Sequence, residues 1–168
     1  LPLALVGRNI AQFERIFDCK LSYLQTDASL SNEQLAEQVH LSKNACWRRI
    51  KQLEASGVIS KRVALLNPKA VDLALCVFVT VRVKEHSLAW LEQFERALEN
   101  LPQITGAFRT TGEIDYLLSV RVKDVEGYDE FYKSFIRLVP SMDLSATFVM
   151  EELKNSTVLP VKVTRTRA

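Results

Sequence analysis

Residues 31–53, SNEQLAEQVHLSKNACWRRIKQL, predict two short helices joined by a tight turn. Ser31 is a suitable N-cap for the first helix, and Gln34, three residues later, completes a capping box. Leu30 and Leu35 flank that cap at the positions of a hydrophobic staple. Ser42 is then a suitable N-cap for the second helix. No other stretch of the chain restricts the fold as strongly as this pair of capped helices.

The second helix separates its side chains by face. Cys46, Ile50 and Leu53 recur at helical spacing and are expected to point inward. The opposite, mostly basic face is formed by Lys43, Asn44, Trp47, Arg48 and Lys51. A basic helix that follows a short turn fits the major groove of DNA, although an ordinary helical hairpin with a solvated face is the alternative. The two caps and the small Ala36 at the expected helix crossing favour DNA binding.

Side-chain chemistry suggests a role for each residue of this face. Asn44 can pair with an adenine edge and Arg48 with a guanine edge, whereas the two lysines suit phosphates. Trp47 has two interpretations that stay open at this point. It either contacts a sugar or a thymine methyl group, or it packs on the preceding helix.

Charge and composition agree with a folded DNA-binding protein. The chain is 48% hydrophobic and 25% charged, which is sufficient to bury a core. Residues 1–66 contain nine Lys and Arg against six Asp and Glu, whereas residues 67–168 contain thirteen against fourteen. The basic excess thus accompanies the helical pair. No apolar run approaches the roughly 20 residues of a membrane span, and Leu1–Gly7 is too short for a signal peptide.

The sequence contains no recognisable catalytic or metal-binding constellation. Three widely separated cysteines, Cys19, Cys46 and Cys76, have no metal-ligand spacing and are expected to be reduced, mostly buried thiols of a cytosolic protein. Neither His40 nor His86 has a nucleophile at diagnostic spacing. We therefore expect no enzyme activity, no metal and no cofactor; an enzyme would be argued from fold analogy alone.

Two segments flank the helical pair. Asn9–Asp27 has apolar residues at helical spacing and predicts a first helix. After the pair, Gly57 is a natural helix end, and Val58–Leu66 is expected to be extended, with Lys61 and Arg62 placed for backbone phosphates as in a winged variant. Asn67–Pro68 breaks the pattern. We therefore expect a DNA-binding domain over residues 1–66 and a second domain over residues 67–168.

The second domain alternates strands and helices. The expected elements are a strand, a helix, two strands that form a hairpin, a second helix and a last strand, in the ranges Leu73–Lys84, Leu88–Leu101, Ile104–Thr111, Asp115–Lys123, Val125–Val139 and Asp143–Leu153. Residues 154–168 are expected to be a tail. The order βαββαβ predicts a ferredoxin-like module and an α+β fold class for the chain.

The strand predicted at Leu73–Lys84 is apolar on both faces. One face holds Leu75 and four valines, and the other holds Cys76, Phe78 and Thr80. A half-exposed antiparallel strand is normally polar on one side. We therefore expect helices to cover one face and a partner subunit to cover the other. The helix expected over Val125–Val139 should point four aromatic residues inward, namely Tyr128, Phe131, Tyr132 and Phe135.

The two halves together resemble the Lrp/AsnC (feast/famine) family of transcriptional regulators. The resemblance is carried in order by LAEQVHLSKNACWRRIKQLEASGVI at Leu35–Ile59, ALLNP at Ala64–Pro68, TGEIDYLL at Thr111–Leu118 and FVMEELKNSTVLP at Phe148–Pro160. It implies a cytoplasmic homodimer that assembles further, often to an octamer. It also implies binding to double-stranded DNA and a response to a small effector, usually an amino acid. The sequence departs from the family at Phe17, commonly acidic there, and at His40, where many relatives have Gly.

The candidate effector site is the loop Thr111, Gly112, Glu113, Ile114 and Asp115. Glu113 or Asp115 could pair with the ammonium of an amino acid, and backbone N–H groups near Gly112 could hold its carboxylate. The residues alone favour another interpretation, a hairpin turn that needs Gly112 for a positive φ and has Asp115 as its cap. The resemblance favours the effector site, because this loop lines a cleft between dimers in the family. Ser145 and Thr147 are weaker candidates for the polar lining. An architectural DNA-bending protein without an effector is the alternative function.

Overall fold

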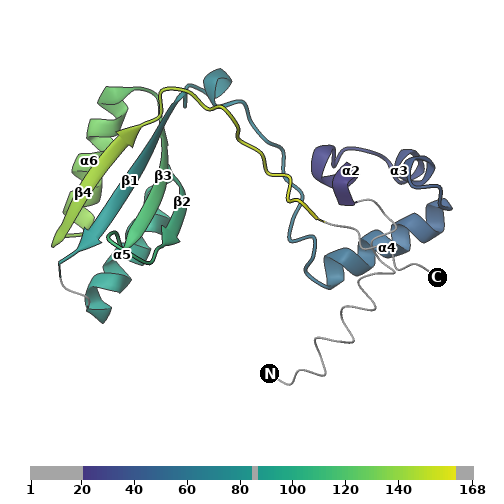
Figure 1. The fold of residues 1–168 in the computed structure, drawn as a ribbon, viewed down its shortest axis with the longest axis horizontal. Helices are drawn as coiled ribbons and strands as arrows, with labels where there is room; N and C mark the ends of the chain where they lie inside the picture. The colour runs from purple at the N-terminus through teal and green to yellow at the C-terminus, as the bar shows by residue number, and fades with distance from the viewer. Residues whose placement is uncertain (1–20, 85–86, 162–168) are drawn as a thin grey trace. The chain divides into compact units, whose positions relative to one another are not determined.

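The computed structural model describes residues 21–84 and 87–161, and it divides into two compact units. The sheet unit spans Leu65–Leu153. The helical unit comprises the described residues before 65 together with residues 154–161, which follow the sheet unit in the chain (Figure 1). This grouping differs from the expected division at residue 66, since it places the start of the tail with the helices.

The helical unit contains α2 (Leu21–Thr26), α3 (Asn32–Gln38) and α4 (Lys43–Ala55). The predicted capping box of α3 is confirmed: Ser31 Oγ accepts from the Gln34 N–H at 3.2 Å, and Gln34 Oε1 accepts from the Ser31 N–H at 2.9 Å. Ser42 Oγ accepts from the Ala45 N–H at 3.3 Å and caps α4. Of the helix expected over Asn9–Asp27, residues 9–20 lie outside the described residues.

The turn between α3 and α4 places a histidine where glycine is usual. The Leu41 N–H donates to the Ala36 carbonyl at 3.0 Å and the His40 N–H to that of Glu37 at 3.3 Å, which is the Schellman pattern. His40 takes the left-handed position of this motif, with φ of 54°. Gly57, just after α4, has φ of 76°. The departure from the family at His40 therefore keeps the turn but adds backbone strain.

The inward face of α4 is confirmed. Cys46 and Ile50 form one small cluster with residues of α3, and Leu53 forms another with Leu21. The following segment, Val58–Leu66, makes no strand and exposes most of its side chains. The helical unit is therefore held by two caps and a small apolar core.

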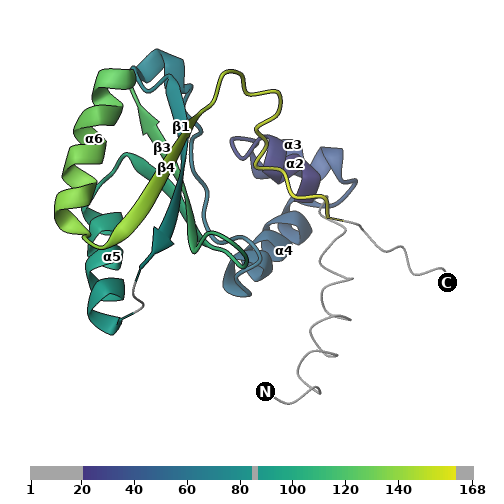
Figure 2. The ribbon, with the colours of Figure 1, turned by 60° about the vertical axis from the view of Figure 1, so that its left-hand side comes forward.

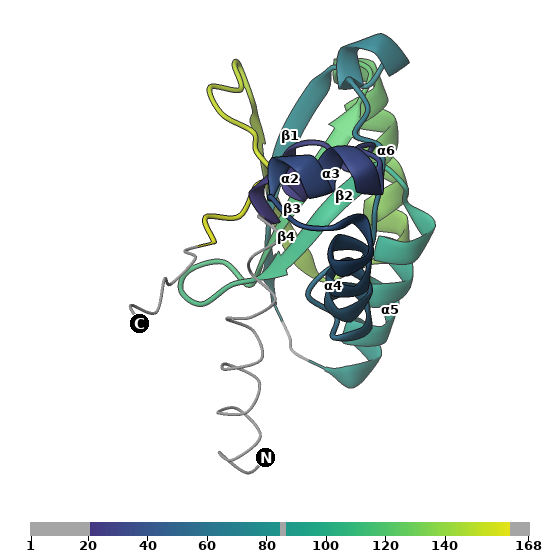
Figure 3. The ribbon, with the colours of Figure 1, turned by 90° about the vertical axis from the view of Figure 1, so that its right-hand side faces the viewer.

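The sheet unit has the expected ferredoxin-like order. Its elements are the 3-10 turn η1 (Pro68–Val71), β1 (Leu75–Val83), α5 (Leu88–Asn100), β2 (Ile104–Arg109), β3 (Tyr116–Val122), α6 (Val125–Leu138) and β4 (Met142–Phe148). The four strands are antiparallel in the order β2-β3-β1-β4. β4 ends at Phe148, earlier than the expected Leu153. Both helices lie on the same face of the sheet (Figures 2 and 3).

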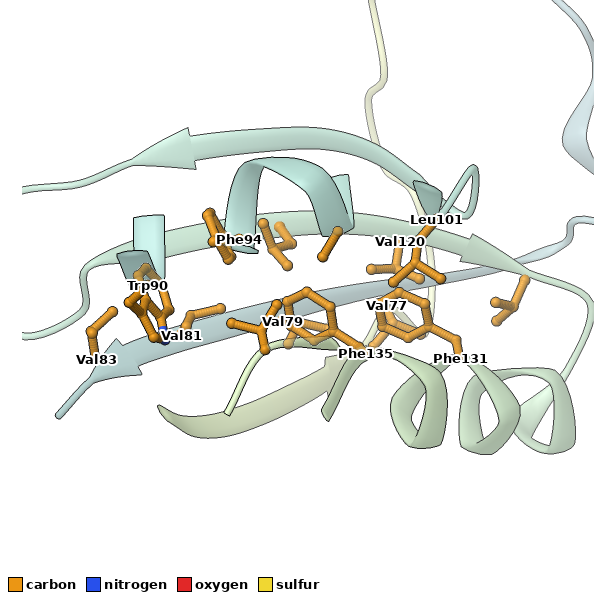
Figure 4. Close-up of a cluster of buried hydrophobic side chains, with 14 residues drawn as sticks. Val77, Val79, Val81, Val83, Trp90, Phe94, Leu101, Val120, Phe131 and Phe135 are labelled. Carbon is orange, nitrogen blue, oxygen red and sulfur yellow. The ribbon is translucent and has the colours of Figure 1, made fainter. Parts of the chain in front are cut away.

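The covered face of the sheet supplies one continuous core. Fourteen buried residues cluster between β1, β3 and the two helices (Figure 4). Trp90 stacks on Phe94 at 5.0 Å between ring centroids, and Phe131 stacks on Phe135 at 5.6 Å. The expectation that Tyr132 faces inward is wrong: it is 38% exposed, because the residue next to a buried helical position turns to the flank of the helix.

The opposite face of the sheet, termed the open face, has no helix over it in the described part of the sheet unit. The strand register brings onto it Cys76, Phe78, Thr80 and Arg82 from β1, Leu117, Ser119 and Arg121 from β3, and Asp143, Ser145 and Thr147 from β4. Phe78 is 40% exposed there. The two-faced character predicted for β1 is thus present, with one face covered and one exposed.

Two further features concern the cysteines and the character of the helices in the described residues. Cys46 and Cys76 are buried thiols that form no disulfide, and Cys19 lies outside the described ranges. Within these ranges, no helix combines the length and the apolar character that crossing a lipid bilayer requires.

Candidate nucleic-acid interface and effector loop

The five residues predicted to contact DNA share the outer face of α4. All are exposed: Lys43, Asn44, Trp47, Arg48 and Lys51. Their spacing of one helical turn places them on one side of the helix, away from the buried Cys46 and Ile50. Trp47 is 52% exposed, so much of its ring is available to a partner. The helix therefore presents amide, guanidinium and ammonium donors together with one apolar ring.

Two glutamates hold the lysines at the ends of this face. Lys43 pairs with Glu33 of α3, and Lys51 Nζ lies 2.8 Å from Glu54 Oε2. The hydrogen bond from each lysine is the main cause that lowers the pKa of its glutamate. These exposed pairs contribute little to stability, but they orient the lysines. The pattern of exposed residues on α4 did not indicate that glutamates orient these lysines. For the second pair, the i,i+3 spacing of Lys51 and Glu54 is a signal in the sequence.

Glu54 also connects the helix to the segment that follows it. Its Oε1 lies 3.1 Å from Arg62 Nη2, while its other oxygen accepts from Lys51. Arg62 was expected to contact the DNA backbone as part of a wing. Through Glu54, its guanidinium is held close to the end of α4, so the basic surface extends beyond the helix itself.

The candidate effector loop is the hairpin turn between β2 and β3. Thr111, Gly112 and Glu113 are exposed, and Gly112 has φ of 118°, a conformation that L side chains rarely adopt. The loop is fastened at both sides: Thr110 Oγ1 donates to the Ile114 carbonyl at 2.6 Å, and Arg82 Nε donates to the Glu113 carbonyl at 2.8 Å. These bonds fix the loop backbone and leave its tip exposed.

Asp115 has a structural role in this geometry. Its N–H donates to the Val81 carbonyl at 2.9 Å, and its Oδ2 accepts from the Val83 N–H at 2.7 Å. The carboxylate therefore caps the end of β1, rather than the hairpin turn to which the turn interpretation assigned it. An ammonium ligand would have to share this carboxylate with the backbone, which makes the exposed Glu113 the better acceptor.

Ser145 and Thr147 lie on the open face of β4, opposite Thr80 and Phe78 of β1. The hairpin loop joins β3, on the other side of β1. Two strand spacings, about 10 Å, therefore separate these hydroxyls from the β3 side. The single chain places the loop and the hydroxyls near one sheet surface but does not bring them together. No group of three or more possible metal ligands occurs in the described residues.

Comparisons with known proteins match both units. The winged helix-turn-helix DNA-binding family matches residues 21–60, and the Lrp/AsnC ligand binding domain family matches residues 76–159. The glutamate uptake regulatory protein of Zymomonas mobilis is 46% identical over 153 residues, covering 90% of this chain and 93% of that protein. The DNA-binding transcriptional activator DecR of Escherichia coli is 41% identical over 143 residues, covering 84% and 94%.

Solved structures agree over a similar extent. An AsnC family transcriptional regulator from Agrobacterium tumefaciens superposes with a TM-score of 0.80 at 41% identity, covering 88% of this chain and 94% of that one. A transcriptional regulator from Neisseria meningitidis, solved as a complex with L-Met, has the same TM-score and coverage at 32% identity. With both units matched in order and nearly end to end by these relatives, the chain belongs to the Lrp/AsnC family of transcriptional regulators.

Proposed function

We propose that this protein regulates transcription by reading double-stranded DNA with α4 and that a free amino acid modulates its binding. The observation that carries the proposal is the exposed face of α4, where Asn44 and Arg48 lie between two lysines. Amide and guanidinium groups read base edges, whereas lysines bind phosphates. Trp47, half exposed between them, is suited to a sugar or a thymine methyl group.

The loop Thr111–Asp115 is the proposed amino-acid site. Glu113 would pair with the ammonium, the exposed N–H groups around Gly112 would bind the carboxylate, and Ser145 and Thr147 would add hydroxyls from β4. Support comes from the relative of 32% identity that was solved with L-Met. Because one chain leaves these groups apart, neighbouring subunits would have to complete the site.

Assembly is proposed to occur through the open face. Phe78 and Phe108 are 40% and 57% exposed, and Phe108 pairs with Leu117, on the same surface. A second copy of this face would cover these rings and form a homodimer, from which a larger assembly such as an octamer could form. Two copies of α4 would then lie about 34–36 Å apart, or a multiple of that, to enter successive major grooves. Phe78→Asp should convert the dimer to a monomer in sedimentation velocity.

The DNA interface is tested with an operator selected from a random duplex library. Arg48→Ala should weaken binding to the selected duplex by about 1–3 kcal/mol and relax the preference at one base pair, because a bidentate base contact is lost. Lys51→Ala should weaken all duplexes alike and lower the salt dependence of binding. If Arg48→Ala binds the selected duplex as tightly as the wild type, α4 does not read bases through this residue.

The effector site is tested by a thermal-shift screen of the common amino acids, followed by calorimetry with the one that stabilises the protein. Glu113→Gln should reduce its affinity about tenfold or more, since a hydrogen bond to a charged group contributes roughly 1.5–3 kcal/mol. Operator binding without the amino acid should be unchanged. Gly112→Ala is the control, because it strains the turn whether or not a ligand binds. Undiminished affinity in Glu113→Gln would leave the loop as a turn only.

A further inference from the structure

Three cations of the helical unit that were assigned to DNA phosphates each have a carboxylate partner. Lys43 pairs with Glu33 of α3. Glu54 pairs with two cations at once, because its Oε2 lies 2.8 Å from Lys51 Nζ and its Oε1 lies 3.1 Å from Arg62 Nη2. Both oxygens of one carboxylate are therefore engaged by side chains that suit phosphates.

The groups assigned to base edges have no such partners. Within the ranges that the structure describes, the Arg48 guanidinium makes no ion pair and the Asn44 side chain makes no hydrogen bond. Both side chains are exposed on the same face of α4. Along this face, carboxylates thus accompany the lysines that suit phosphates and not the groups that suit base edges.

The turn after α4 fixes the position of Glu54 between its two cations. The Gly57 N–H donates to the Glu54 carbonyl at 3.1 Å, and the Ile59 N–H donates to the Leu53 carbonyl at 3.1 Å. Ile59 then packs against both apolar clusters of the helical unit. Because this anchored turn reverses the chain, Arg62 lies beside Glu54 although the two are eight positions apart.

We propose that Glu33 and Glu54 restrain DNA binding, because they hold cations that phosphates would otherwise engage. The proposal rests on the proposed function. Carboxylate and phosphate oxygens are alternative acceptors for the same ammonium and guanidinium groups. Exposed ion pairs are weak, so a phosphate can displace each carboxylate, but it must approach a negative charge to do so.

The restraint acts on contacts with the DNA backbone. Such contacts supply essentially all of the binding to a duplex of unrelated sequence. A duplex that also offers suitable base edges to Asn44 and Arg48 gains further affinity through contacts that the glutamates do not oppose. The two glutamates thus prevent the helical unit from binding DNA firmly through its charge alone.

Glu54→Gln tests the restraint in the full chain, because it keeps the size of the side chain and removes its charge. The variant should bind a labelled duplex of mixed sequence about three- to tenfold more tightly at about 0.1 M salt. The slope of log affinity against log salt should become steeper by up to about 0.9 for each cation released. The measurement is fluorescence anisotropy at several salt concentrations, with thermal melting as the check that the fold is unchanged.

Glu33→Gln provides a second, independent variant, since it should release Lys43 in the same way. The gains from Glu33→Gln and Glu54→Gln should add in the double variant, because the two pairs share no residue. Lys43 and Lys51 are also eight residues, about 12 Å, apart along α4.

Two controls separate the release of cations from the change in net charge. Glu37→Gln removes the same charge from an exposed position of α3 that makes no ion pair in the described ranges. Glu92→Gln removes the charge and also breaks an ion pair, but with Arg96 of the sheet unit. Each control should change the affinity and the slope less than Glu54→Gln.

The sharpest comparison uses K51Q/R62Q, in which Glu54 has neither of its cations to release. In that background, Glu54→Gln should strengthen binding no more than Glu37→Gln does. If Glu54→Gln strengthens wild-type binding no more than Glu37→Gln, or weakens it, the restraint is overturned. In either case, weaker operator binding by Arg48→Ala would leave the proposed function standing. A wild-type protein that binds no duplex would overturn both.

Discussion

In the sheet unit, fourteen buried residues form a single cluster, four of them large aromatic side chains, whereas the described helical unit buries six residues in two clusters. In the helical unit this smaller core is accompanied by a capping box, a second N-cap and two residues of positive φ, His40 and Gly57. The difference suits the two tasks. A large packed core provides a rigid platform for the proposed assembly, while a small unit can devote most of its surface to a partner.

The two units also differ in their ionisable groups. The described carboxylates with a displaced pKa, namely Asp27, Glu33 and Glu54, all belong to the helical unit. In each, a side-chain hydrogen bond is the main cause that lowers the pKa. In the sheet unit, burial and the neighbouring Tyr132 raise the pKa of Tyr128. The units should therefore lose stability at opposite ends of the pH range.

The largest expected effect comes from removing core side chains. Phe135→Ala should cost the sheet unit about 3–5 kcal/mol, and Leu35→Ala should cost the helical unit about 2–5 kcal/mol, because each leaves a cavity in a fully buried site. Each unit contains one tryptophan, Trp90 and Trp47 respectively, so Trp47→Phe and Trp90→Phe backgrounds report the two unfolding transitions separately by fluorescence. If each alanine substitution shifts both unfolding transitions equally, the two units unfold together and do not differ in stability as expected.

A smaller pair of changes tests the helix ends. His40→Gly should stabilise the helical unit, and Gly57→Ala should destabilise it, each by about 1 kcal/mol, since both positions have positive φ. Nothing lies within 4 Å of a Cβ built at Gly57, so the expected cost there is conformational rather than steric. Urea denaturation followed at Trp47 measures both. A destabilised His40→Gly would mean that the imidazole makes contacts whose loss exceeds the backbone strain.

The smallest expected effect is the dependence on pH. Glu33 and Glu54 have a lower pKa in the folded state than in the unfolded state. Their carboxylates therefore stabilise the helical unit above the unfolded pKa, and this stabilisation is lost as the pH falls, so the unit should weaken below about pH 4.5. Tyr128 has a pKa raised above its ordinary value of 10.0 in the folded state. Its protonated form therefore stabilises the sheet unit below that value, and the stabilisation is lost as the pH rises through the folded pKa, so the sheet unit should weaken at alkaline pH. Tyr128→Phe should remove the alkaline loss. If the unfolding midpoints of the two units shift equally at acid and at alkaline pH, the expected difference between the units is contradicted.

Features set by neighbouring residues could be predicted from the sequence. The capping box at Ser31 and Gln34, the buried face of α4 and the alternation along β1 all depend on spacings of two to four residues. The exposed face of α4, which is proposed to contact DNA, followed from the same periodicity. For the loop, the sequence offered two interpretations of Asp115, and neither included the bond that its carboxylate accepts from the Val83 N–H of β1.

Features set by distant residues could not be predicted in this way. Trp90 Nε1 donates to the Pro140 carbonyl at 2.9 Å, and no local spacing indicates this partner, fifty residues further along the chain. Tyr132 was assigned to the core because its spacing from Tyr128 is helical, yet the sheet beneath accommodates Phe131 and Phe135. The two hydrogen bonds between the Gln25 side chain and the Leu159 backbone have no local signal, because neither residue is unusual for its own segment.

The contact in which the Leu159 N–H donates to Gln25 Oε1 and Gln25 Nε2 donates to the Leu159 carbonyl has a consequence for how the chain is made. Its two residues are 134 positions apart, and the whole sheet unit lies between them. On the ribosome, α3 and α4 can form while the sheet unit is still being synthesised, but Leu159 emerges only after β4 is complete. The hydrogen bonds between Gln25 and Leu159 can therefore form only after the whole sheet unit has been synthesised. A nascent chain that ends before Leu159 would carry α4 without these bonds.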